Sequence, residues 1–243
     1  MLPELAREEL SAALDTVVME LLAEATVAGP PVDAFRVARR LGIAVAEDDR
    51  QRGRARYVRL AGHRGRAAAP TILLRPEPRR ERKHWAVAHE IGEHAALRVF
   101  KLLAVDPREA LPGARETVAN HVAGRLLLPT EWFVADAIAC DWNLLELKSR
   151  YTSASHELIA RRMLECGPSV IVSIYDHGRL YFRRSNLPGR VPPPSSAELQ
   201  CWQTVHDRNH PEQTYEGLRT IQGWPVHEED WRREILRTEV EEW

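Results

Sequence analysis

The stretch RKHWAVAHEIGEHAAL, residues 82–97, places two histidines and two glutamates within the hexapeptide HEIGEH at 89–94. Its other residues are mostly apolar or small, so a helix formed here is predicted to be largely buried, and buried charges require partners or a metal ion. Zinc peptidases carry H-E-x-x-H, because two histidines one helical turn apart converge on one ion with the glutamate beside them as general base. Here Glu93 takes the position of the second histidine, and His94 follows one residue later.

Two ligand arrangements remain open for this stretch. On a regular helix, His89 and Glu93 share one face, whereas His94 lies about 140° around the axis. A carboxylate is a competent ligand for zinc, manganese or iron. A π-bulge that absorbed one residue would instead align His94 with His89. The second ligand is therefore Glu93 or, in the alternative, His94.

A second segment, ARETVANHVAGRLLLP at 114–129, supplies a third ligand candidate. It predicts a helix whose later face is apolar, with Glu116 at its start. A carboxylate from a second helix completes the His/His/Glu sites of zinc peptidases and leaves the fourth position for water. Asn120 lies one turn from Glu116 and could hold that carboxylate or a substrate. His121 is a further candidate for the lining of the cleft.

The two segments together resemble the ImmA/IrrE family of metallopeptidases. That family typically has H-E-[LI]-G-H followed by E-x-x-A-N-x-F-A-A-x-L-L-M-P. This chain has HEIG at 89–92 and then Glu116, Ala119-Asn120, Ala123, Leu126-Leu127 and Pro129 at the matching spacing. The opening segment from Pro31 to Ile43 resembles the start of the family, so the likeness extends over residues 30–166. Val122, Gly124 and Leu128 depart from the family's Phe, Ala and Met, which are changes in core packing.

The resemblance implies an α+β fold with a zincin-like minimal metallopeptidase domain: a small sheet, several helices and an active-site helix. It implies one bound divalent metal, zinc in the first place and manganese or iron as alternatives. His89 and Glu116 would be metal ligands and Glu90 the general base that takes a proton from metal-bound water. The implied substrate is a partner protein such as a transcriptional repressor in a stress, phage or mobile-element response. Glu93 in place of the second histidine would make the ion a weaker Lewis acid.

Composition fits a soluble, cytoplasmic protein without a membrane partner. The chain has 243 residues, of which 44% are hydrophobic and 28% charged, and its apolar runs are shorter than a membrane span. The three cysteines are far apart, which argues against a disulfide framework or a cysteine metal cluster. Residues 50–83 contain twelve basic and two acidic residues, whereas residues 198–243 contain five arginines and eleven acidic residues. The basic segment could be a solvated face or could meet nucleic acid.

The chain is expected to divide into an N-terminal helix at 1–29, the metallopeptidase domain at 30–166, and a C-terminal part at 167–243. Helices are predicted at 3–26, 33–41, 81–103, 115–128, 130–139, 142–148 and 153–165, with short strands at 43–46, 56–60 and 71–74. The C-terminal part is predicted to contain a β-hairpin around Asp176-His177-Gly178, a proline-rich linker and an acidic tail. Four tryptophans in this tail are expected to pack against something: Trp202, Trp224, Trp231 and Trp243.

Two other functions compete with the peptidase. The first is a non-catalytic metal-binding interaction module of the same fold, which Glu93 and the Trp-rich tail favour. The second is a DNA-associated regulator that uses the basic segment and a helix-turn-helix-like element at 142–165. If that element contacts DNA, His156, Arg161 and Arg162 would form its exposed face; the alternative is that its two helices simply pack in the core. Three histidines of the tail are too widely spaced in the sequence to predict a metal site: His206, His210 and His227.

Overall fold

The computed structural model of the protein describes residues 7–50, 52–60 and 69–240, and these fall into two compact units. The first unit extends to residue 135 and includes residues 150–155; the second comprises residues 136–149 and the described residues from 156 to 240. This division differs from the expected boundaries after residues 29 and 166. The N-terminal helix packs within the first unit, and the helices around residues 140 and 160 belong with the C-terminal sheet.

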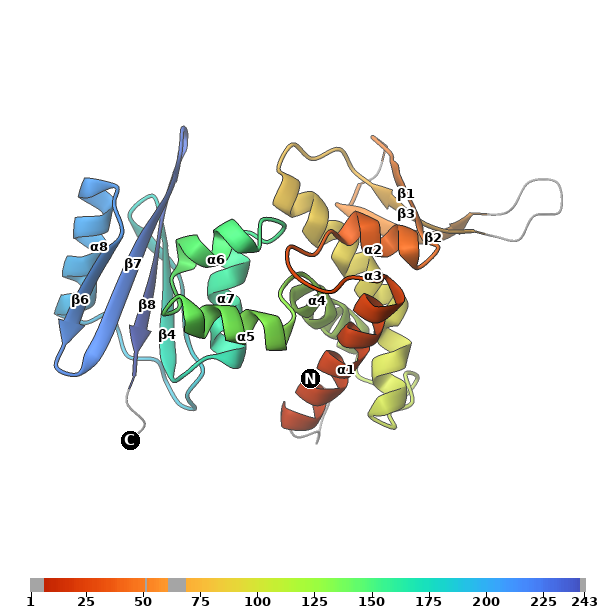
Figure 1. The fold of residues 1–243 in the computed structure, drawn as a ribbon, viewed down its shortest axis with the longest axis horizontal. Coiled ribbons are helices and arrows are strands. Elements are labelled where there is room, and N and C mark those ends of the chain that lie inside the picture. Colours follow the sequence, from red (N-terminus) through yellow and green to blue (C-terminus); the bar gives the residue numbers. More distant parts are fainter. Residues whose placement is uncertain (1–6, 51, 61–68, 241–243) are drawn as a thin grey trace. The chain divides into compact units, whose positions relative to one another are not determined.

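The first unit is a small sheet covered by helices (Figure 1). Its strands β1 (Ala44–Glu47), β2 (Ala55–Leu60) and β3 (Ala69–Leu74) lie in the order β1-β3-β2, with β1 parallel and β2 antiparallel to β3. The helices are α1 (Arg7–Glu24), α2 (Ala34–Arg40), α3 (Arg80–Leu102), α4 (Ala114–Leu127) and the start of α5 (Thr130–Ala139). The predicted helices and the predicted sheet are thus present. Asp33 caps α2, because its side chain accepts hydrogen bonds from the N–H groups of Phe35 and Arg36.

The core of the first unit forms where α1, α3 and α4 meet. Apolar residues at helical spacing on each helix are fully buried there: Leu14, Val17, Val18 and Leu21 of α1, Val87 and Ile91 of α3, and Val118 and Val122 of α4. A partly buried ion pair joins α1 to α4, with Arg125 Nε 3.2 Å from Asp15 Oδ1. The core therefore holds α3 and α4 side by side.

The second unit is built on a five-stranded antiparallel sheet in the order β5-β4-β8-β7-β6. Its strands are β4 (Val170–Asp176), β5 (Arg179–Ser185), β6 (Glu212–Glu216), β7 (Arg219–Glu228) and β8 (Trp231–Glu239). Helix α8 (Ser196–Arg208) covers one face of the sheet, and α7 (His156–Cys166), following α6 (Leu144–Arg150), packs on β4 and β8 from the other side (Figure 1). The sheet therefore lies between two helical layers.

The predicted hairpin is present, since β4 and β5 flank a turn at His177-Gly178 with positive φ at both residues. The region expected to be a tail contains a helix and three strands, and β8 pairs with β4 in the same sheet. Trp224 is buried and Trp202 stacks on Tyr175, whereas Trp231 is 37% exposed. Trp243 lies outside the described residues.

One arginine of the face that would contact DNA is buried in α7, as expected if these helices pack in the core. Arg162 is buried and forms an ion pair with Glu165. Arg161 pairs with Glu157 and lies over the ring of Phe182 at 4.0 Å. Both guanidinium groups therefore have partners within the unit. In the described ranges no helix combines the length and apolarity needed to cross a membrane.

Candidate metal centre on helices α3 and α4

Three side chains converge between α3 and α4: His89, Glu93 and Glu116. Each offers one ligand atom, and these atoms lie within 4.8 Å of one another. His89 Nε2 is 3.6 Å from Glu116 Oε2. His89 and Glu93 are one turn apart on α3, which remains α-helical from Arg80 to Leu102 with no π-turn between residues 89 and 94. The regular helix therefore turns Glu93, and not His94, toward Glu116.

His94 lies elsewhere, against strand β2. Its Nδ1 is 3.0 Å from the Tyr57 hydroxyl, and the two ring centroids are 5.3 Å apart. Burial, and secondly the positive charges of Arg98 and Arg59, lower the pKa of His94 below its ordinary value. A neutral imidazole that hydrogen-bonds to a tyrosine is stable in such a place without a metal ion.

Glu90, the predicted general base, is buried beside the cluster with only 8% of its surface exposed. Its Oε2 accepts a hydrogen bond of 2.6 Å from the backbone N–H of Tyr57, on the edge strand β2. Burial raises the pKa of the Glu90 carboxyl above its ordinary value, and the Tyr57 N–H opposes that shift only in part. A buried carboxyl with a raised pKa is suited to accept a proton.

Asn120 connects two of the three cluster residues. Its Oδ1 is 3.1 Å from His89 Nδ1, and its Nδ2 donates to Glu116 Oε1 at 3.2 Å. Because an amide oxygen can only accept, Nδ1 of His89 carries a proton in this hydrogen bond, which leaves Nε2, on the side of Glu116, as the nitrogen that could bind a metal. Asn120 thus fixes both the imidazole tautomer and the glutamate rotamer, which is how outer residues orient metal ligands.

A glycine allows the two helices to approach this closely. A Cβ atom built on Gly92 would lie 2.5 Å from the backbone oxygen of Ala119 and 2.9 Å from its Cα. Only a residue without a side chain fits between His89 and Glu93 at this crossing. Gly92 therefore sets the distance between α3, which carries two cluster residues, and α4, which carries Glu116 and Asn120.

The positively charged side chain of Arg115 lies at the edge of the cluster. The Nε of Arg115 is 2.6 Å from Glu93 Oε2, and its Nη2 donates to the Glu93 carbonyl at 3.0 Å. The Arg115 side chain is 55% exposed and that of Glu116 is 62% exposed, so the cluster opens to solvent on this side. An ion would share the Glu93 carboxylate with this guanidinium group.

The donor set fits a divalent metal. One imidazole nitrogen and two carboxylates suit zinc, and they suit manganese or iron as well. Two carboxylates that face each other across a small opening also repel, which a divalent cation relieves.

The sequence did not reveal every residue near the cluster. Tyr57 and Arg115 were not predicted to take part; nothing in the spacing joins Tyr57 on β2 to residues 90 and 94. Arg115 could have been suspected, because it precedes Glu116 at a helix start. His121 was expected to line the cleft, but its Nδ1 is 3.4 Å from Arg125, where α4 packs on α1.

A small sheet beside a helix pair with clustered histidine and glutamate ligands is typical of metallopeptidase domains. The chain belongs to the peptidase family described as IrrE N-terminal-like domain, whose family model matches residues 38–164. Among solved structures, the fold is similar to that of a Mycobacterium tuberculosis transcriptional regulator, with a TM-score of 0.63 and 15% identity over 92% of this chain and 74% of that chain. No curated protein sequence matches the chain.

Proposed function

We propose that the protein is a metal-dependent endopeptidase. His89, Glu93 and Glu116 would hold one divalent ion, with zinc as the first candidate, and Glu90 would act as the base. The observation that carries the proposal is the convergence of these three ligand atoms within 4.8 Å beside a buried carboxyl of raised pKa. A bound ion would supply a water ligand of lowered pKa and would polarise a peptide carbonyl.

Residues of the chain itself would orient the metal ligands and transfer the proton. Asn120 orients His89 and Glu116 from α4. The Tyr57 N–H holds Oε2 of Glu90, so Oε1 is the atom that would accept the proton and later deliver it to the leaving amine. Because Glu93 is anionic and also bound to Arg115, we expect slower hydrolysis than at a site with two histidines and one glutamate.

The proposed substrate is a protein, in the first place a repressor-like partner in a stress, phage or mobile-element response. Family membership and the structural likeness to a transcriptional regulator support a regulatory setting. DNA is the weaker candidate, because Arg161 and Arg162 have partners within the unit. A cytoplasmic location fits a substrate of this kind.

The test is cleavage of a proteome-derived peptide library, read by mass spectrometry, with zinc, manganese or iron supplied. Glu90→Gln is the matched control, since glutamine fills the same space and can still accept from Tyr57. The proposal expects specific cleavage by the wild type and none by Glu90→Gln at equal metal content. Equal cleavage by both proteins, or by neither with metal bound, would contradict it.

A second candidate is a metal-binding interaction module without catalysis. The ion pair between Arg115 and Glu93 favours this candidate, because it keeps one proposed ligand engaged. The substitution Arg115→Ala removes this ion pair and should distinguish a peptidase from an interaction module. If the wild type is inactive but binds metal, and Arg115→Ala also remains inactive, the interaction module is the better description.

A further inference from the structure

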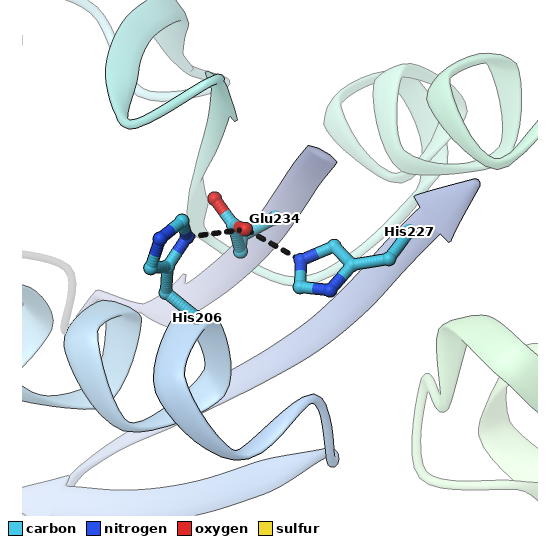
Figure 2. Close-up of side chains that lie close together, drawn as sticks. All are labelled: His206, His227 and Glu234. Carbon is cyan, nitrogen blue, oxygen red and sulfur yellow. Dashed lines mark hydrogen bonds and ion pairs between the residues drawn. The ribbon is translucent and has the colours of Figure 1, made fainter. Parts of the chain in front are cut away.

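The second unit contains a buried glutamate held between two histidines. Glu234 of β8 is completely buried, and its Oε1 lies 2.6 Å from His227 Nε2 and 2.9 Å from His206 Nδ1 (Figure 2). The three ligand atoms lie within 4.8 Å of one another. This cluster belongs to a different compact unit from His89 and Glu116.

Three elements far apart in sequence bring the cluster together. His206 lies in the last turn of α8, His227 near the end of β7, and Glu234 on the neighbouring strand β8 (Figure 2). In the β7–β8 ladder Glu234 is opposite Pro225, so His227, two residues further along β7, has its side chain on the same face. That face is the one α8 covers, which adds His206.

A tryptophan fixes the other oxygen of the carboxylate. The indole N–H of Trp202 donates to Glu234 Oε2 at 3.0 Å. Trp202 lies one turn before His206 on α8 and stacks on Tyr175, with ring centroids 5.1 Å apart and an angle of 23° between the planes. The carboxylate is therefore oriented so that Oε1 faces the imidazoles, as a hydrogen-bonded metal ligand is.

Arg233 and Arg237 of β8 have their side chains on the opposite face of the strand from Glu234, and Arg232, on the same face, is exposed. Arg233 binds Asp176 and Glu157, and Arg237 binds Gln222 and Glu239. In the described part of the chain, the cationic partners of Glu234 are thus the two histidines. A fully buried carboxylate needs a positive charge nearby, either protonated imidazole or a metal ion.

We propose that His206 Nδ1, His227 Nε2 and Glu234 Oε1 form a second divalent-cation site, of the class that takes zinc. Two imidazole nitrogens and one carboxylate oxygen are a common set of three protein ligands for zinc. Ligand atoms around a tetrahedral zinc ion are about 3.4 Å apart, so each imidazole would have to move outward by less than about 1 Å. The His206 side chain is 24% exposed, which leaves an approach for the ion and for a water as fourth ligand.

The consequence of binding follows from the position of the ligands. An ion there would tie α8 to β7 and β8 and would stabilise the second unit, because it binds only when all three elements are in place. This inference is independent of the peptidase proposal, since it uses no residue of the first unit. It predicts zinc-dependent stability even in a protein whose first centre is disabled.

Zinc titration of the full chain carrying His89→Ala and Glu116→Ala tests the site. We expect one equivalent of zinc and a rise in Tm. Adding His227→Gln or His206→Gln should abolish both, whereas His210→Gln should change neither, because His210 follows the helix and its ring contacts the Pro211 carbonyl. Absence of zinc binding in the parent, or its retention in both cluster variants, would overturn the proposal.

Two further measurements keep the test decisive if these variants fail to fold. Trp202→Phe keeps the ring stack but removes the indole N–H, and it should weaken zinc binding by about 10- to 100-fold. An unchanged affinity would contradict the assigned role of Trp202. Wild-type crystals grown with zinc should show an anomalous difference peak between His206, His227 and Glu234. Crystals without a peak at this position would refute the site directly.

Discussion

At the scale of single residues, the buried Glu90 carboxylate is needed for the proposed catalysis but lowers the stability of the metal-free fold at pH 7. Its pKa is raised in the folded protein by burial, so the stability it contributes is complete below its unfolded pKa and is lost as the pH rises through the folded value. In metal-free protein at pH 7, Glu90→Gln should therefore be more stable than the wild type, by about 1 kcal/mol, while peptide cleavage is lost. Thermal unfolding at pH 4 and pH 7 measures this, and an equal difference at both pH values would contradict the assignment.

Asn120 is the second residue whose role can be isolated. Asn120→Ala removes the hydrogen bonds to His89 and Glu116 without touching a ligand atom. Metal affinity measured by competition with a chelator should fall by about 10- to 100-fold. His121→Asn, on the adjacent position but turned toward α1, is the control and should leave the affinity unchanged. Equal effects of the two substitutions would mean that helix packing, and not ligand orientation, is being measured.

At the scale of elements, the α3–α4 crossing determines whether the cluster forms. Alanine normally stabilises a helix relative to glycine by about 0.5–1 kcal/mol. At Gly92 the sign should reverse, because the new methyl group would overlap the Ala119 backbone. We expect Gly92→Ala to destabilise the protein by about 1–3 kcal/mol and to weaken metal binding. Denaturant unfolding with a metal assay tests both, and a stabilised variant with normal metal binding would disprove the close contact.

Elements were predicted from the sequence with unequal success, for a physical reason. Helix α3 was expected at 81–103 and is present at Arg80–Leu102, because an apolar stripe at helical spacing is easily recognised. Strands β7 and β8 were missed. Both have continuous buried stretches, since helices cover the two faces of the sheet and remove the usual alternation. In the sequence, the charged residues of this region, among them Glu234 and Arg237, resembled those of a solvated tail, although both are buried in the fold.

The same contrast applies to the two candidate centres. His89, Glu93 and Glu116 could be proposed from spacing along two helices, because local geometry determines which residues share a face. Whether Glu93 or His94 faced Glu116 depended on the regularity of α3. The cluster of His206, His227 and Glu234 could not be foreseen, because strand pairing and the docking of α8 create it.

At the scale of the whole molecule, the second unit should be sensitive to acid. In the second unit, burial alone would raise the pKa of Glu198, but hydrogen bonds from Arg183, Thr238 and the Ser195 N–H outweigh burial, and the pKa is lowered. A carboxyl with a depressed pKa stabilises the fold above its unfolded value near 4.5, and this contribution disappears as the pH falls through the folded value. Acid should therefore weaken the second unit.

Glu198→Gln tests this prediction. At pH 7 it should cost about 3 kcal/mol, because it leaves the buried guanidinium of Arg183 without its counter-charge. The difference from the wild type should shrink as the pH falls through the lowered pKa of Glu198, because the wild-type carboxyl then becomes protonated as well. Denaturant unfolding of both proteins at several pH values measures this difference, with the exposed Glu229→Gln as control. A constant difference at every pH would show that Glu198 acts through packing alone.

In the proposed metal centre, Glu93 on a regular helix, and not His94, completes the ligand set with His89 and Glu116. Elemental analysis of purified wild type, Glu93→Ala and His94→Ala after zinc loading tests it most directly. We predict that Glu93→Ala contains one equivalent of metal less than the wild type, whereas His94→Ala contains as much as the wild type. Loss of that equivalent in His94→Ala, with full metal content in Glu93→Ala, would contradict it.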